Sequence, residues 1–436
     1  MSDAFVRSWR RTGLALGLLW LAATVGRSAA VSDAFYALPP NPGERLPATG
    51  IYPQGRTLGF MGYSGDPARD LTNGFTVAGP VYGNQLPYLL RCESNGWPSV
   101  AHIGLPITFA DKNPARYQLD EPSLRREILR QMQAFSTFRQ IAWWGIRPEE
   151  LRPWRRDEMN YLRIVCEVIR QNDPRHRPLY LYNPNHRDAA SLTPVARYVD
   201  AVGKGCYVNS VGRKRDRAWV RWSVEQETGA IRAASRTNAF PLLNPELCAD
   251  PAPAEDREIR GWVRHDVYLG LASGAKGVVI WSLYPRPAVH RTWKLWYDAY
   301  AECARELNGP RGLSRVFLFG ERRSGLKVSL VKGDRNAQVT LGGEAEPTTT
   351  SEQERAARKV QLPAWTSAEF AFGDSRWLFL INSANSPAGF SISGWPQGSR
   401  AEDAFSGRPI PLETGGVQSM SLPAYGVVGI RFRNGR

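Results

Sequence analysis

The sequence predicts a (β/α)8 barrel, the TIM-barrel fold of the α/β class, followed by a C-terminal antiparallel β-sandwich. Eight short apolar runs alternate with amphipathic stretches over roughly 250 residues, which matches this barrel in count and length. The helical pattern stops near residue 310, and only short strand-like runs follow it. No G-x-G-x-x-G turn follows the first run, which argues against a doubly wound sheet as the alternative.

The predicted barrel strands are rich in β-branched and aromatic residues and are bounded by Gly, Pro or Asn. They are Leu58–Tyr63, Phe75–Val81, Val100–Phe109, Ile141–Ile146, Pro178–Tyr182, Val199–Tyr207, Phe240–Leu243 and Gly277–Leu283. Apolar residues at helical spacing predict helices between several of them. These are Ser123–Phe138, Pro153–Asn172, Asp256–Leu271 and Arg291–Asn308, the last ending at the termination signal Asn308-Gly309-Pro310.

Close spacing without helices marks the predicted sandwich strands. They are Val316–Phe319, Leu326–Val331, Ala337–Leu341, Ala368–Phe372, Trp377–Ile381, Phe390–Ile392 and Val427–Phe432. The polar stretch Glu344–Lys359 is predicted to be a mobile loop within this unit, because strands resume after it. We therefore expect a signal peptide at 1–30, a catalytic barrel at 31–312 and a β-sandwich at 313–436.

The N-terminus predicts export to the periplasm or the extracellular space. Arg7, Arg10 and Arg11 precede the apolar run from Gly13 to Val25, and small residues follow at a suitable cleavage position before Val31. Thirteen apolar residues are too few for a membrane span, which needs roughly 20. We expect no membrane span after cleavage.

Composition limits the class of partner. The chain has 436 residues, a formal net charge of +15, and 15 Trp, 16 Tyr and 16 Phe, a combination typical of nucleic-acid or carbohydrate binding. Cleavage would remove four Arg and one Asp, and an exported protein rarely has nucleic acid as its substrate, so carbohydrate is favoured. The five Cys and five His show no metal-ligand spacing, so neither a metal nor another cofactor is expected.

Two carboxylate segments follow predicted barrel strands, where the active site of such a barrel lies. Glu149 and Glu150 follow the fourth strand, and Glu246 follows the seventh. Two carboxylates facing each other across the barrel mouth can protonate a leaving oxygen and attack an anomeric carbon. Trp281 and Tyr284 at the end of the eighth strand, and Trp144 in the fourth, offer flat apolar faces for sugar rings.

This layout resembles the retaining glycoside hydrolases of the large (β/α)8 clan, whose catalytic glutamates follow strands four and seven. The resemblance covers about residues 56–436, including the C-terminal segment Leu422–Val427, and assigns no particular family. It implies that Glu149 or Glu150 is the acid/base, that Glu246 is the nucleophile and that Trp281 contacts sugar. The chain departs from the clan where Pro148, in place of the usual Asn, precedes two glutamates, so the choice between them stays open.

Further candidate substrate-binding residues follow or end other strands. They are Tyr63, His102, Asn183, Asn185, His186, Lys204 and Tyr207. Structural alternatives remain for several positions: Pro148–Glu150 could open a helix, Trp281 could be core, and the Asn-rich turn could cap a helix near Ala189.

The remaining positive charge is densest in two segments, Arg147–Arg156 and Arg213–Trp222. If it is functional, the substrate is an anionic glycan, whereas a solvated basic face needs no ligand. Two functions follow: an exported, retaining glycoside hydrolase that cleaves O-glycosidic bonds of a polysaccharide or oligosaccharide, or a catalytically inactive barrel that binds glycans at the cell surface.

Overall fold

The computed structural model describes residues 58–105, 120–209, 217–286, 290–341, 356–413 and 416–433. Its central feature is a seven-stranded parallel sheet in the order β1-β7-β6-β5-β4-β3-β2. The strands are β1 (Gly59–Gly62), β2 (Ser99–Gly104), β3 (Ile141–Arg147), β4 (Leu179–Asn183), β5 (Ala201–Cys206), β6 (Phe240–Pro245) and β7 (Gly277–Ile280). The first and last strands pair directly, which is barrel order and excludes the doubly wound alternative.

The second predicted strand is not a regular strand, although it lies in the expected place. Residues 75–81 run between β1 and β2: the Thr76 amide donates to the Phe60 carbonyl (2.9 Å) and the Val100 amide to the Ala78 carbonyl (3.0 Å). Pro80 has no N–H and Gly79 has a φ of 86°, so a continuous ladder cannot form here. The segment closes the ring as an eighth, irregular position, so β3 and β6 occupy its fourth and seventh places.

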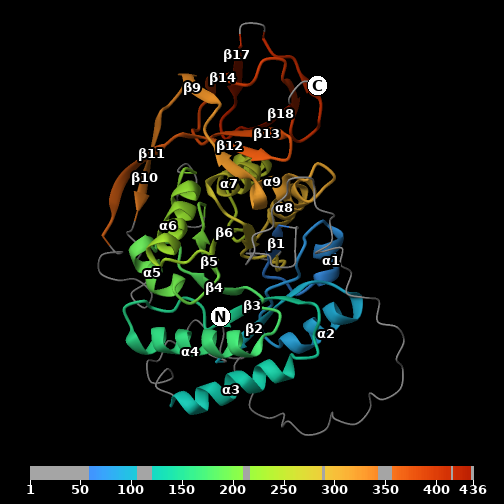
Figure 1. The fold of residues 1–436 in the computed structure, drawn as a ribbon, viewed down its shortest axis with the longest axis vertical. Coiled ribbons are helices and arrows are strands. Elements are labelled where there is room, and N and C mark those ends of the chain that lie inside the picture. The colour runs from blue at the N-terminus through green and yellow to red at the C-terminus, as the bar shows by residue number, and fades with distance from the viewer. Residues whose placement is uncertain are drawn as a thin grey trace.

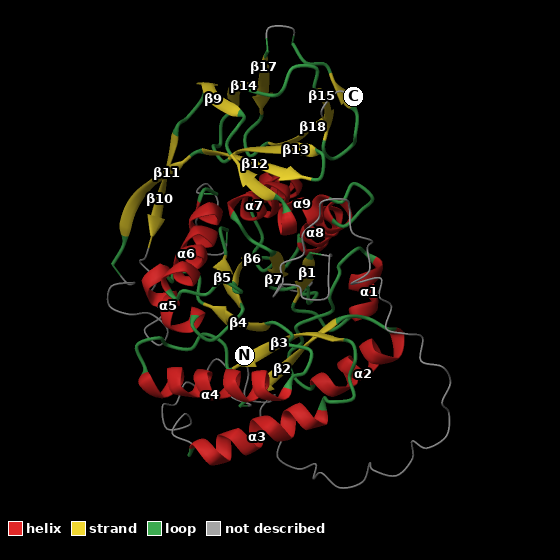
Figure 2. Ribbon diagram, in the orientation of Figure 1, coloured by secondary structure: helices red, strands yellow, loops and turns green. Residues whose placement is uncertain are grey.

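Helices surround this sheet (Figures 1 and 2). They are α1 (Pro67–Thr72), α2 (Gln85–Asn95), α3 (Glu121–Ala134), α4 (Arg156–Asn172), α5 (Ala189–Ala196), α6 (Trp219–Ala233), α7 (Ile259–Ser273), α8 (Trp293–Leu307) and α9 (Leu313–Phe319), with a 3-10 turn at Pro253–Glu258. The four predicted helices are confirmed with shifted ends. Pro148–Glu150 does not open a helix, because α4 begins only at Arg156, whereas α5 does begin at Ala189 with Asp188 as its N-cap.

Two antiparallel sheets follow the barrel. One has the order β16-β15-β18-β13-β12-β8 and the other β17-β14-β9, with a separate β10-β11 hairpin. Their strands are β8 (Glu321–Arg323), β9 (Lys327–Lys332), β10 (Asn336–Leu341), β11 (Arg358–Pro363), β12 (Trp365–Phe372), β13 (Ser375–Asn382), β14 (Ala388–Ser393), β15 (Arg400–Asp403), β16 (Pro409–Ile410), β17 (Val417–Leu422) and β18 (Val427–Arg433). The predicted barrel and sandwich are thus both confirmed as fold class.

The central strand β13 of the six-stranded sheet is buried on both faces, which ties the sandwich to the barrel (Figure 1). Along β13, Trp377, Phe379 and Ile381 join the barrel's core, whereas Leu378 and Leu380 join a second core against β14. Side chains of a strand alternate between its faces, so one strand serves both layers. Helices α7 and α9 pack beneath β12 on the barrel side.

One prediction in this region is wrong, and a second is wrong at its C-terminal end. Val316–Phe319 lies in helix α9, because Leu313, Val316 and Phe317 form one buried helical face; a four-residue apolar run does not distinguish strand from helix. The half-buried Lys276 ammonium donates to the carbonyls of Phe317 and Leu318 at the end of this helix. The predicted loop Glu344–Lys359 lies largely outside the described residues, but its last two residues begin β11.

Glycines on the inner face of the barrel make room for side chains from neighbouring strands. A Cβ on Gly145 of β3 would lie 2.2 Å from Cδ2 of His102, and a Cβ on Gly203 of β5 would lie 2.2 Å from Oδ1 of Asn244. The interior layers of such a barrel are filled from alternate strands, so the intervening strands carry small residues there.

We expect Gly145→Ala to lower the free energy of unfolding by about 1–3 kcal/mol through overpacking against His102. Urea denaturation measures this change. The matched control is Gly261→Ala on α7, where an added Cβ meets nothing within 4 Å and should stabilise the helix by about 0.5–1 kcal/mol. If the two variants have the same free energy of unfolding, the prediction is wrong, because the inner face can then accommodate an added Cβ at Gly145.

Candidate active site

Glu149 follows β3, and side chains from three other parts of the sheet gather around its carboxylate. The Tyr63 hydroxyl, just after β1, donates to Glu149 Oε1. Tyr180 of β4 interacts with Tyr63 and with the Glu149 charge, and Asn244 Nδ2 of β6 donates to the Tyr180 hydroxyl at 2.8 Å. Residues of β4 and β6 and the residue after β1 therefore lie together beside the Glu149 carboxyl group.

The negative charge of Glu149 affects the pKa of the tyrosines around it. Burial raises the pKa of Tyr63 well above 10.0, and the nearby Glu149 carboxylate raises it further. Burial and then Glu149 raise the pKa of Tyr180 and of Tyr82 as well. All three hydroxyls therefore stay protonated near neutral pH and are available as donors. Glu149 itself is half-buried.

Glu246 lies directly after β6 and is 4% exposed. The Trp281 amide donates to the Pro245 carbonyl (3.0 Å) and the Leu247 amide to the Trp281 carbonyl (2.7 Å), so the backbone on both sides of Glu246 is tied to the segment after β7. The Asn209 amide, from the loop after β5, donates to Glu246 Oε1. The Tyr300 hydroxyl of α8 donates to the Glu246 carbonyl at 2.8 Å. Both the backbone and the carboxylate are thus held in place.

Six stacked rings form a surface between the two glutamates, which we call the aromatic mouth. One row stacks Tyr63 on Tyr82 (4.9 Å between centroids) and Tyr82 on Tyr284 (5.8 Å). A second row stacks Tyr182 on Tyr207 (6.3 Å) and Tyr207 on Trp281 (5.5 Å). Trp281 Nε1 donates to the Tyr82 hydroxyl at 2.7 Å and joins the rows. Tyr82 is 42% exposed whereas Tyr63 and Tyr182 are buried, so a ligand can reach the mouth at Tyr82.

Glu150 has a different environment from its neighbour. Its amide donates to the Tyr182 carbonyl at 3.0 Å, its φ is 55° and it is 7% exposed. Burial raises the pKa of Tyr182, and the Glu150 charge is the next cause. Glu150 therefore lies beside the second row of the mouth, whereas Glu149 is bonded to the first.

The structure brings six of the predicted site residues into this group and places others elsewhere. Those in the group are Glu149, Glu246, Tyr63, Tyr207, Trp281 and Tyr284, with Glu150 at its edge. Asn185 and His186 are buried in the loop after β4. His102 lies over Gly145, and burial, with the charge of Arg147 adding to it, lowers its pKa well below 6.5, so its ring is neutral at neutral pH.

Trp144, Lys204 and Asn183 lie outside the group. Trp144 faces the outer helices, where its Nε1 donates to Asp173 (2.9 Å) and Arg177 stacks on its ring. Lys204 points outward to α6, with its Nζ 3.1 Å from Ser223 Oγ and above the Trp222 ring. The Asn183 amide donates to two backbone carbonyls. Alternate residues of a strand point to opposite faces of the sheet, and Trp144 and Lys204 occupy positions that face outward.

Several residues of the site were missed from the sequence. Tyr82 follows the second predicted strand directly, so the rule that selected the other candidates could have found it. Tyr180 and Tyr182 lie inside a predicted strand. Asn244 directly follows the predicted strand Phe240–Leu243, two residues before Glu246 on the same inward face, a signal that period-2 alternation supplies. Asn209 carries no such signal, because its backbone amide makes the contact.

Part of the positive charge of the predicted basic segments is neutralised within the protein. Arg152 pairs with Glu158, and Arg217 pairs with Asp266, all four side chains being buried. Residues 213–216 lie outside the described part. Two other arginines do reach the mouth: Arg147 Cζ lies 5.9 Å from the Tyr82 ring and Arg286 Cζ 5.1 Å from the Trp281 ring. Arg147 donates to the Val81 carbonyl and Arg286 to the Ser282 hydroxyl, both neutral acceptors.

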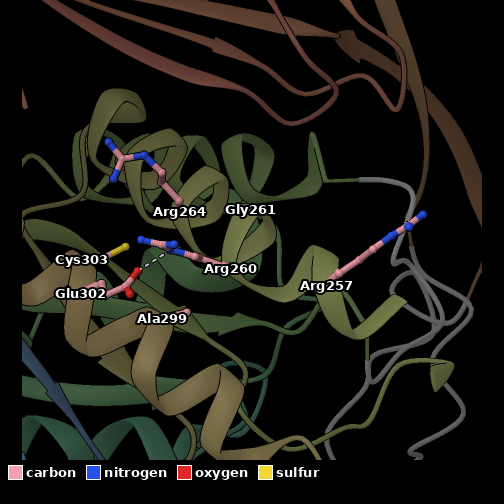
Figure 3. Close-up of a pocket in the computed structure, with 7 residues that line it drawn as sticks. All are labelled: Arg257, Arg260, Gly261, Arg264, Ala299, Glu302 and Cys303. Atoms are coloured by element: carbon pink, nitrogen blue, oxygen red, sulfur yellow. Dashed lines mark hydrogen bonds and ion pairs between the residues drawn. The ribbon is translucent and has the colours of Figure 1, made fainter. Parts of the chain in front are cut away.

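A separate pocket lies between α7 and α8, away from the mouth (Figure 3). Its arginines are already paired: Arg260 with Glu302 at 2.6 Å and Arg257 with Glu258 at 3.1 Å. Within the described ranges, no three His, Cys, Asp or Glu residues are grouped to hold a metal ion. No helix in those ranges combines the length and apolar character needed to cross a membrane.

Comparison with solved structures returns glycoside hydrolases, the class that the sequence resembles. An α-galactosidase I from Mortierella vinacea is 9% identical, with a TM-score of 0.48, over 89% of this chain and 99% of that one. An α-amylase from Geobacillus thermoleovorans is 7% identical, with a TM-score of 0.47, over 84% and 90%. A GH30 endoxylanase from Clostridium papyrosolvens is 11% identical, with a TM-score of 0.42, over 87% and 96%.

No family model and no curated protein sequence matches the chain. With TM-scores below 0.5, the likenesses to solved structures carry no argument about the site, so function has to be argued from this chain's own residues.

Proposed function

We propose that the protein is a glycoside hydrolase that cleaves O-glycosidic bonds, with Glu149 as the acid/base and Glu246 as the nucleophile. One observation supports it above all: both glutamates border one aromatic mouth. Glu149 is bonded to Tyr63, Tyr63 stacks on Tyr82, Tyr82 accepts from Trp281, and Trp281 pairs with the backbone of Glu246. Flat rings flanked by two carboxylates suit a sugar ring and its glycosidic bond.

In the proposed reaction, a sugar ring lies on the mouth with its anomeric carbon next to Glu246. The Glu149 carboxyl group protonates the glycosidic oxygen while a Glu246 oxygen attacks the anomeric carbon, so the old C–O bond breaks as the new one forms. Glu149 then takes a proton from water, and that water displaces Glu246. The sugar is released with retained configuration, and both glutamates return to their starting states.

Glu149 is preferred over Glu150 because of its neighbours. The Tyr63 hydroxyl donates to one Glu149 oxygen and orients that carboxyl group beside the first row of the mouth. Glu150 instead lies beside the second row, where its amide donates to the Tyr182 carbonyl.

The glycan is proposed to be anionic, and the protein to be exported. Arg147 and Arg286 supply two guanidinium groups beside the Tyr82 and Trp281 rings, and guanidinium binds carboxylate and sulfate groups well. Export rests on the N-terminal segment, which lies outside the described residues.

A panel of neutral, carboxylated and sulfated glycans tests the proposal. We expect turnover of an anionic glycan that weakens as salt shortens the Debye length from about 30 Å at 0.01 M to about 3 Å at 1 M. Arg286→Gln should raise KM for that glycan by about 10-fold or more, as expected for a lost hydrogen bond to a charged group. The control Arg257→Gln, at an 84% exposed side chain on the outer pocket, should leave KM unchanged.

Equal, salt-independent turnover of neutral glycans would contradict the anionic substrate while leaving the hydrolase in place. Binding of glycans without any turnover would instead favour a catalytically inactive binding barrel.

A further inference from the structure

A buried row of polar side chains connects the C-terminal sandwich to Glu246. Ser383, just after β13, lies 2.9 Å from His265 Nε2, and His265 Nδ1 lies 2.8 Å from Asp266 Oδ1. The other Asp266 oxygen pairs with Arg217 Nη1. Arg217 Nη2 donates to Asn209 Oδ1 at 3.2 Å. The Asn209 amide donates to Glu246 Oε1, which completes the row.

The protons in this row have one consistent arrangement. Burial lowers the pKa of His265 below 6.5, although Asp266 opposes this, so the ring is neutral near pH 7. A neutral imidazole has one N–H and one acceptor nitrogen. The carboxylate of Asp266 can only accept, so Nδ1–H donates to it and Nε2 accepts from the Ser383 hydroxyl. Each hydrogen bond along the row then joins a donor to an acceptor.

Arg217 is the branch point of the row. Its side chain is fully buried and lies over the rings of Trp262 (4.4 Å) and Tyr425 (5.6 Å). The planar guanidinium directs one nitrogen to Asp266 and another to Asn209, whereas an ammonium group would have to reach both acceptors from a single nitrogen. Tyr300, which donates to the Glu246 carbonyl, has its pKa raised mainly by burial and also by Asp266 and Glu246. The ion pair and the glutamate therefore share one buried region.

We infer that Arg217 is a positioning residue: it fixes the Asn209 amide on Glu246, and the C-terminal sandwich anchors it through Asp266, His265 and Ser383. The inference rests on the proposed function for its catalytic consequence, but its structural part does not. A misplacement of about 1 Å can cost roughly 100-fold in rate, so a distant anchor matters for the reaction.

The chain supplies a matched control. Arg177 also lies over a tryptophan (Trp144, 4.3 Å) and also pairs with a buried aspartate (Asp173, 2.8 Å), but on the outer side of the barrel. Arg177→Met therefore removes a comparable stacked ion pair without touching the mouth. Arg217→Lys and Asp266→Asn are milder variants for the case in which Arg217→Met does not fold.

The first measurement is amide hydrogen exchange in the peptide that contains residues 207–209, which needs no substrate. We expect Arg217→Met and Arg217→Lys to speed this exchange at least 10-fold relative to wild type, and Arg177→Met to leave it unchanged. Unchanged exchange in the Arg217 variants, or equal acceleration in Arg177→Met, would overturn the inference.

The second measurement is the separation of kcat from KM on a glycan that wild type hydrolyses. We expect Arg217→Met to lower kcat by about 100-fold with KM within threefold of wild type. Arg217→Lys should rescue little, because its donors lie on one nitrogen and lack the fixed fork that reaches both Asp266 and Asn209. An unchanged kcat would overturn the inference and leave the hydrolase standing. If the wild-type protein hydrolyses no glycan, the proposed function is overturned. The hydrogen-exchange result would still decide the role of Arg217.

Discussion

Glu246→Gln should lower kcat by about 10,000-fold or more on any glycan that the wild-type protein hydrolyses, because glutamine cannot form the covalent bond to the anomeric carbon. The substitution keeps the size of the side chain and leaves an oxygen to accept from the Asn209 amide, so stability should change little. Initial rates over a range of substrate concentrations, with a thermal denaturation curve for each variant, measure both effects.

Glu258→Gln is the control for this prediction, because that carboxylate is half exposed on the outer side of α7 and pairs only with an exposed arginine. It should hydrolyse at the wild-type rate. Hydrolysis by Glu246→Gln at more than a tenth of the wild-type rate would remove Glu246 from the reaction.

Glu149→Gln should lower kcat by about 100- to 10,000-fold on substrates with poor leaving groups, the range expected for loss of a general acid/base. Added azide should restore turnover and give a glycosyl azide, because this anion attacks the covalent intermediate without needing a general base. Product analysis with and without azide measures both results.

Glu150→Gln separates the two neighbouring glutamates. It should keep activity within about 10-fold of wild type and show no response to azide. Glu150 borders Tyr182, whereas it is Glu149 that accepts the hydrogen bond from Tyr63. Azide rescue of Glu150→Gln instead of Glu149→Gln would transfer the acid/base role to Glu150.

Much of the barrel could be predicted from the sequence, because its strands are buried on both faces and appear as apolar runs bounded by turn residues. Residues 75–81 show the limit of that method. The run is apolar and lies in the ring, but Gly79 and Pro80 break its ladder, and the hydrogen bonds that keep it in place come from strands on either side. Helix α9 shows another limit, because its short apolar run is compatible with either a strand or a helix.

The site was predictable where it depends on position along a strand. Glu149, Glu246, Tyr63 and Trp281 all follow strand ends, and the parallel sheet brings these ends together. The Arg213–Trp222 segment was interpreted as a basic surface, yet Arg217 is fully buried. Its partner Asp266 is 49 positions away, and Ser383 lies farther still. Only tertiary structure brings these together, and charge along the sequence does not reveal them.

Capture of the covalent intermediate tests the central claim most directly. Glu149→Gln should accumulate this intermediate on a substrate with a good leaving group, because attack by water then lacks its base. Acid quenching, proteolysis and mass spectrometry should find the mass of one glycosyl unit on the peptide that contains Glu246, and not in the double variant with Glu246→Gln. A glycosyl group on another carboxylate, or turnover with inverted configuration and no adduct, would contradict the account.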